Sequence, residues 1–148
     1  MTTENTENFN GLVSALAETA GVESLTSEDG GVFFAIDDDM GVAITSADAE
    51  EVGVDLLVAT IIVDAAPTDA EALTFLLEQN YLGVGAGDGS FAIEHETGVA
   101  VLYRAFPLPM DAETFVDAFS RLAGAARAAR ARLVNTRETP DLMSEFIV

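Results

Sequence analysis

Residues 32–63, VFFAIDDDMGVAITSADAEEVGVDLLVATIIV, contain three runs that are rich in β-branched and aromatic residues. These runs, at residues 32–36, 40–45 and 54–63, are separated by polar segments. Apolar runs of this length between polar segments are typical of β-strands. Because the connections are short, neighbouring strands are expected to pair antiparallel. The sequence therefore predicts a three-stranded antiparallel meander.

A helix is predicted before the meander. Apolar residues recur at helical spacing over residues 6–20, and Gly21 fits a helix stop. Residues 24–31 (SLTSEDGG) are predicted to form a loop. After a break at residues 65–67, Thr68 and Glu71 have the spacing of a capping box, which predicts a second helix to about residue 81. Its apolar residues exceed one helical stripe, so it needs a cover on two sides.

The rest of the chain predicts a glycine-rich connection, a hairpin and a final helix. Strands are expected at residues 90–94 and 99–106, around a turn at residues 96–98. Asp111 is expected to begin a helix that reaches residue 133, and residues 134–148 are predicted to be a C-terminal tail. The predicted order α-β-β-β-α-β-β-α indicates an α+β fold, an antiparallel twisted sheet packed with helices. Residues 1–133 are expected to form one domain.

The charge is strongly asymmetric. The chain has 26 acidic residues, six arginines and no lysine, which gives a formal net charge of −20. Twenty of the acids precede Arg104, the first basic residue, so residues 1–103 carry −20 and the remainder sums to zero. This charge argues against nucleic-acid and anionic-membrane partners and favours a basic or neutral polypeptide. The alternative is that the acidity only keeps the protein in solution.

The sequence predicts a soluble, cytoplasmic protein without membrane insertion. The N-terminal sequence, MTTENTENFNGLV, has neither the basic n-region nor the apolar h-region of a secretory signal. The longest apolar run, residues 56–63, is far shorter than a membrane span.

Candidate chemical sites each have a simpler structural explanation. The glycines of residues 83–89 (GVGAGDG) follow a helix and lead into a strand, whereas a phosphate loop follows a strand and leads into a helix. Residues 37–39 (DDD) lack the alternating spacing of a calcium loop. His95 is the only histidine and there is no cysteine, so a zinc site is not expected. The arginines of the last helix are expected to pair with the acidic body: Arg121, Arg127, Arg130 and Arg132.

Residues 73–133 resemble the class I type III secretion chaperones, the Tir-chaperone family. The likeness lies in LLEQNYLG at residues 76–83, the glycine stretch, the strand-turn-strand passage that ends in Phe-Pro-Leu at residue 108, and the last helix with Phe119. With the element order of the first half, it covers roughly residues 6–133. The low pI, about 4.1, is also typical of that family.

The resemblance implies a homodimer without catalysis or cofactor, which binds the N-terminal segment of an effector protein and keeps it non-globular. It implies a dimer interface with Leu73, Leu76, Leu77, Asn80, Tyr81 and Leu82. It implies a client groove with Phe9, Leu12, Phe33, Ile36, Val42 and Ile44. Core packing is the alternative for each of these residues. The alternative function is an intracellular regulator or adaptor of the same fold with no secreted client, and a weaker one is an enzyme or small-molecule binder.

Overall fold

The computed structural model describes residues 1–22, 25–28, 30–37, 39–49, 53–64 and 69–147. For residues 28, 49 and 134–147 it describes the backbone alone. The elements follow the order α1 (Thr3–Ala20), β1 (Thr26–Glu28), β2 (Gly31–Ile36), β3 (Met40–Ala49), β4 (Val54–Asp64), α2 (Ala70–Gln79), the 3₁₀ segment η1 (Tyr81–Ala86), β5 (Ser90–Ile93), β6 (Ala100–Pro107) and α3 (Ala112–Ile147).

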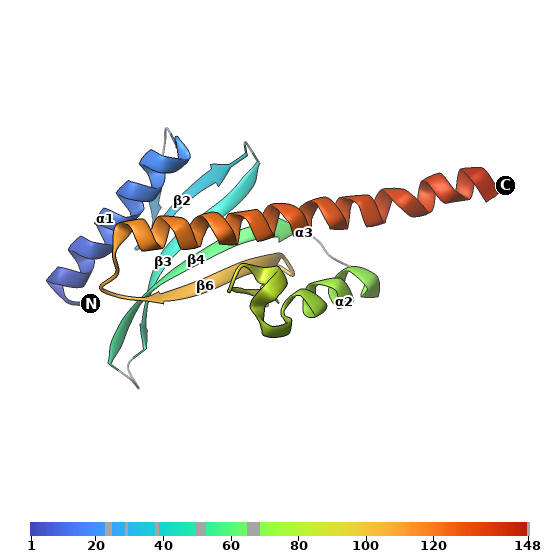
Figure 1. Cartoon of the computed structure of the whole chain (residues 1–148). Coiled ribbons are helices and arrows are strands. Elements are labelled where there is room, and N and C mark those ends of the chain that lie inside the picture. Colours follow the sequence, from blue (N-terminus) through green and yellow to red (C-terminus); the bar gives the residue numbers. More distant parts are fainter. Residues whose placement is uncertain (23–24, 29, 38, 50–52, 65–68, 148) are drawn as a thin grey trace.

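The strands form one six-stranded sheet in the order β1-β2-β3-β4-β6-β5, and all neighbours pair antiparallel. In Figure 1, α3 crosses one face of the sheet with α1 beside it, while α2 and η1 lie at the end that carries β5 and β6. The predicted α+β class with an antiparallel sheet and packed helices is confirmed. The predicted order lacked one strand, β1.

The first strands differ from the prediction at their polar ends. Residues 24–31 were expected to be a loop, but β1 pairs Thr26 with Phe33 of β2. Strand β3 continues four residues beyond the expected end at residue 45, and Asp48 there pairs with Asp55 of β4. Polar residues are tolerated in these strand ends because they reach past the core into solvent.

The ends of α1 and α2 are fixed by side-chain caps. Thr2 accepts a hydrogen bond from the Asn5 amide, and Gly21 ends α1 in the left-handed conformation. At α2 the cap is Asp69, whose carboxylate accepts from the Ala72 amide at 2.7 Å. The prediction of Thr68 as this cap was wrong by one residue, and Thr68 itself lies outside the described residues. Helix α2 ends at Gln79, two residues earlier than expected.

Helix α3 begins where expected, because Asp111 accepts a hydrogen bond from the Thr114 amide. Its backbone stays helical to Ile147, whereas the sequence predicted an end near residue 133. Figure 1 shows its last turns extending beyond the sheet. The boundary between a domain at residues 1–133 and a tail at 134–148 stays a prediction.

The core lies between the sheet and the two long helices. Alternate strand residues face it, among them Ile44, Leu57, Ile61 and Leu102, which are fully buried. Helix α1 contributes Leu12 and Leu16, and α3 contributes Phe115, Phe119 and Leu122. The phenyl rings of Phe106 and Phe115 meet edge to face at 5.2 Å between centroids. This packing covers one face of the sheet, and no helix of the described residues covers the other.

Candidate protein-binding surfaces

The face of the sheet opposite the helices is apolar and open. Strand residues that alternate with the core residues point to this face, which we call the open face. Two rows of residues cross it: Phe33–Ala43–Thr60–Tyr103, which are paired in the strand register, and Ala35–Gly41–Ile62–Val101, in which the Ile62 side chain lies against Gly41. In both rows the residue on β3 is small and has larger neighbours. The small residues therefore form the floor of a groove between two walls.

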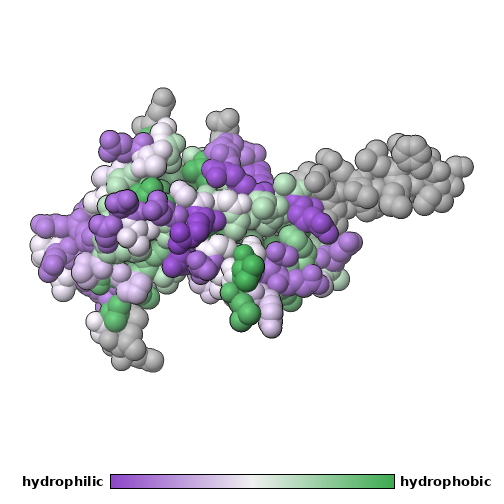
Figure 2. Space-filling view, viewed as in Figure 1, coloured by the Kyte–Doolittle hydropathy of each residue, from purple (hydrophilic) through white to green (hydrophobic). Residues whose placement is uncertain are grey.

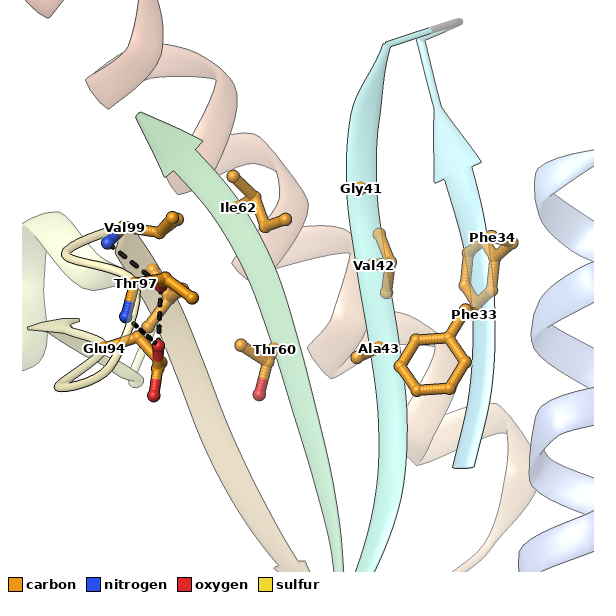
Figure 3. Close-up of a pocket in the computed structure, with 11 residues that line it drawn as sticks. Phe33, Phe34, Gly41, Val42, Ala43, Thr60, Ile62, Glu94, Thr97 and Val99 are labelled. Atoms are coloured by element: carbon orange, nitrogen blue, oxygen red, sulfur yellow. Dashed lines mark hydrogen bonds between the residues drawn. The ribbon is translucent and has the colours of Figure 1, made fainter. Parts of the chain in front are cut away.

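The groove has a volume of about 390 Å³ and is lined by residues of β2, β3, β4 and β6 and of the β5–β6 connection. Figure 3 shows it from the open face, with α3 behind the strands. Phe33 and Ile62 line the groove and still expose 39% and 44% of their surface. At Gly41 a Cβ atom would lie 3.2 Å from the Ile62 Cδ1 atom, so the glycine keeps the floor low. A cavity of roughly 150 Å³ holds benzene, so this volume accommodates more than one apolar side chain.

The turn between β5 and β6 borders one end of the groove. The Glu94 carboxylate accepts hydrogen bonds from the Thr97 hydroxyl at 2.6 Å, the Thr97 amide at 2.8 Å and the Glu96 amide at 3.2 Å. Figure 3 shows the two bonds from Thr97. These bonds, that from the Thr97 hydroxyl above all, hold the pKa of Glu94 below its usual value. An ionised carboxylate therefore stays at this end of the groove.

The residues predicted for the client groove fall on two different faces. Phe33 lies on the open face, but the other five residues have side chains that are buried in the core between the sheet and the helices: Phe9, Leu12, Ile36, Val42 and Ile44. Strand alternation separates Phe33 from Ile36, and the sequence did not say which face α1 covers. The groove lining also includes residues that the sequence reasoning did not name, the half-buried Ala43, Thr60 and Val101 and the exposed Ile62. Their signal was the period-two alternation with the buried strand residues.

A second exposed apolar surface covers α2 and η1. Leu77, Tyr81, Leu82 and Val84 expose 70%, 75%, 80% and 85% of their surface. Figure 2 shows a hydrophobic patch over η1 on this side of the molecule. Beside it lies a pocket of about 230 Å³, lined by Leu73, Leu76, Leu77, Phe91, Ala92 and Ile93. We call these residues, with Tyr81, Leu82 and Val84, the α2–η1 surface.

The structure separates the predicted dimer residues into three kinds. Leu77, Tyr81 and Leu82 are exposed, and Leu73 is half-buried. Leu76 exposes only 4% of its surface and belongs to the core. Asn80 ties α2 to β5, because its amide donates to the Phe91 carbonyl at 3.0 Å and accepts from the Phe91 amide at 2.7 Å. Sequence reasoning missed Val84, which it assigned to the glycine-rich connection.

The glycine-rich connection is close-packed. A Cβ atom at Gly87 would lie 2.7 Å from the Arg121 carbonyl oxygen of α3. A Cβ atom at Gly89 would lie 2.6 Å from the Tyr103 carbonyl oxygen. Only glycine allows both approaches, so the turn that follows η1 sits directly against α3 and β6. Leu82 in η1 adopts a left-handed backbone, with φ of 56°, which is strained for leucine.

The acidic turn between β2 and β3 binds the last helix. The Arg127 guanidinium forms two hydrogen bonds to the Asp37 carboxylate, the one from Arg127 Nη2 at 3.2 Å. Arg130 binds Asp39 in the same way, at 2.8 and 3.2 Å. The hydrogen bond from Arg127 lowers the pKa of Asp37. The prediction that these arginines pair with the acidic body is confirmed for Arg127 and Arg130.

Other kinds of site were searched in the described part of the chain. Within it, no group of three or more His, Asp or Glu side chains is placed to hold a metal ion. None of its helices is long and apolar enough to cross a membrane.

Comparison with known proteins first defines the class of fold. The structure is similar to the chaperone–effector complex of HopA1 and SchA, with a TM-score of 0.65 and 16% identity over 88% of this chain and 98% of that one. It is similar to the Yersinia pestis type III secretion chaperone SycH bound to a fragment of YscM2, with a TM-score of 0.58 and 15% identity over 82% and 98%. It is also similar to the ExoU–SpcU complex from Pseudomonas aeruginosa, with a TM-score of 0.55 and 21% identity over 82% and 93%. The fold is that of the type III secretion chaperones.

The sequence then gives the family. The model of the Tir chaperone protein (CesT) family matches residues 11–130. The chain therefore belongs to this family, and the resemblance seen in the sequence is confirmed. No curated protein matched the sequence.

Proposed function

We propose that this protein is a non-enzymatic type III secretion chaperone of the cytoplasm that binds the N-terminal segment of one effector protein. The observation that carries the proposal is the open groove of about 390 Å³ on a sheet face that no helix covers. Its family and its fold neighbours are chaperones, three of which were solved in complex with a partner. The bound segment would stay soluble and non-globular until it is secreted.

The groove suits a segment without a core of its own. Such a segment must bury its apolar side chains on the chaperone, because it cannot bury them internally. The larger groove residues offer two walls, and the small floor residues leave room for the incoming side chains. Apolar burial of this kind is non-directional. The groove can therefore hold a segment by size and hydrophobicity while the segment lacks a fixed tertiary structure.

We further propose a homodimer formed through the α2–η1 surface. Four large apolar side chains there, those of Leu77, Tyr81, Leu82 and Val84, are more exposed than is usual for a monomer. They lie beside an apolar pocket that they can fill on a second copy. A twofold interface uses the same surface on both subunits, so the exposed side chains of each subunit can fill the pocket of the other. This surface and the open groove involve different residues, so the dimer leaves the groove accessible.

We propose that no reaction is catalysed and that no cofactor is used. The groove lining in the described residues is apolar, apart from Thr60, Thr97 and Glu94. The Glu94 carboxylate is already engaged by three donors of its own turn. General acid–base catalysis needs a group whose pKa is near the operating pH, and the pKa of Glu94 is shifted away from it.

The test is binding of the N-terminal fragment of the protein encoded beside this chain's gene. Isothermal titration calorimetry compares the wild type with Ala43→Phe, which fills the groove from its floor. The matched control is Ala47→Phe, on the same strand and face but outside the groove lining. We expect Ala43→Phe to weaken binding at least about tenfold, since it removes the space for an apolar side chain worth ~1.5 kcal/mol or more. The control should bind like the wild type.

Two results would contradict the proposal. Equal binding by wild type and Ala43→Phe would place the client elsewhere on the molecule. No binding of the fragment to the folded wild type would favour the alternative function, a regulator or adaptor without a secreted client.

A further inference from the structure

The two faces of the sheet differ in charge. Every arginine whose side chain the structure describes lies on the side covered by the helices. Arg104 stacks over the Phe106 ring at 4.8 Å and Arg132 over the Phe75 ring at 5.6 Å. Arg127 and Arg130 bind the acidic turn, and Arg121 lies 3.9 Å from Asp88. The positive charge of the body is thus placed away from the open face.

The open face carries carboxylates and, among the described side chains, no arginine; His95 lies between Glu94 and Glu96 in the turn at its β5–β6 end. Glu94 lines the groove at the end formed by β5 and β6. Glu96 is exposed in the same turn. Phe33, at the β2 end, is apolar. The groove therefore runs from an apolar end to an acidic end.

We infer that the segment in this groove has an apolar centre and carries Lys or Arg on the flank that lies at the β5–β6 end. The inference rests on the proposed function and adds the chemistry of the partner to it. A basic flank gains the attraction of Glu94 and its neighbours, while an acidic flank is repelled by them and by the net charge of −20. The apolar centre provides affinity, and the flank provides selectivity and orientation.

The probes are two synthetic peptides that share one apolar centre and end in two lysines or in two glutamates. Fluorescence anisotropy measures their affinity for the full chain at low and at high salt. We expect the lysine peptide to bind about 3- to 10-fold more tightly at low salt, since each exposed ion pair contributes a few-fold at most. The difference should shrink at high salt because exposed charges are screened.

Two variants distinguish the effect of the charge at the groove from the effect of the overall charge on the preference for lysine. Glu94→Gln removes the charge at the groove and keeps one oxygen that can accept from the Thr97 hydroxyl and amide, while the bond from the Glu96 amide is lost. Glu113→Gln removes one exposed charge from the first turn of α3, on the helix-covered side. We expect Glu94→Gln to reduce the preference for lysine and Glu113→Gln to leave it unchanged.

Each outcome has a distinct meaning. If both peptides bind equally and Ala43→Phe weakens both, the client groove stands and the inference about its flank is overturned. If the two glutamate variants reduce the preference equally, the overall charge is responsible and the inference is overturned. If neither peptide binds the wild type at any salt concentration, the inference and the proposed groove fail together.

Discussion

Replacing Leu77 with serine is the sharpest test of the proposed dimer. Leu77 projects from α2 with 70% of its surface exposed, so it contributes little to the core of its own chain. Full burial of a leucine is worth about 1.5–3 kcal/mol, so burial of the remaining 70% on dimerisation is worth about 1–2 kcal/mol. A twofold interface contains the residue twice, which doubles the loss to about 2–4 kcal/mol. We therefore expect a dimer about 30- to 1000-fold weaker.

Sedimentation equilibrium over a concentration series measures this change as a shift in the dissociation constant. Circular dichroism at the same concentrations shows whether the variant remains folded. Ile62→Ser, at a residue of the open groove that is 44% exposed, is the control and should leave the dimer intact. Leu76 is unsuitable for this test because it is 4% exposed and a polar residue there would unfold the core. An unchanged dissociation constant for Leu77→Ser would refute the α2–η1 interface.

Three further predictions concern η1 and the acidic turn. Gly87→Ala should lower the free energy of unfolding, measured in urea, by about 1–3 kcal/mol, because the new Cβ atom would lie 2.7 Å from the α3 backbone and the φ of residue 87 is positive. The control Gly124→Ala has open space around residue 124 and should not lower the free energy of unfolding. Equal effects of the two substitutions would contradict the close approach at Gly87. Leu82→Gly should relieve roughly 1 kcal/mol of backbone strain at φ 56°, so the monomer should be at least as stable as the wild type. Sedimentation should show a weaker dimer. A less stable monomer would contradict the claim that Leu82 is strained. Asp37→Asn should remove a contribution to stability that depends on pH. The pKa of Asp37 is lower in the folded state than its ordinary value of 3.8, so the ion pair with Arg127 stabilises the fold fully above pH 3.8. This stabilisation is lost as the pH falls through the pKa of the folded state. Urea unfolding should show a wild-type advantage at neutral pH that disappears in acid, and an advantage that persists in acid would refute this assignment.

The element order was largely predictable because most strands and helices have a clear local pattern. The apolar, β-branched run at residues 54–63 and the helical spacing in residues 6–20 are such patterns, and they form β4 and α1 in the structure. The strand β1 was missed because its three residues, Thr26–Glu28, are too few to show a period.

The site was only partly predictable, since it depends on which face a helix covers. Alternation puts Phe33 and Ile36 on opposite faces of β2, but the choice of the open face is made by long-range packing of α1. The role of the glycines was hidden for the same reason. Gly87 and Gly89 are required by the approach of α3 and β6, elements remote in sequence. A glycine run alone does not distinguish close packing from flexibility.

The two hydrogen bonds between Asn80 and Phe91 affect how the sheet can grow. Strand β5 is the last strand of the sheet, and an unpaired edge is a template for sheet extension from chain to chain. The Asn80 amide occupies both main-chain groups of Phe91 and so takes the place of a neighbouring strand at that point. A second copy that docks beside β5 therefore meets an edge that is already satisfied there, and association proceeds through side chains. In the proposed chaperone, which would hold an extended polypeptide, this closure of one edge would work against open-ended polymerisation.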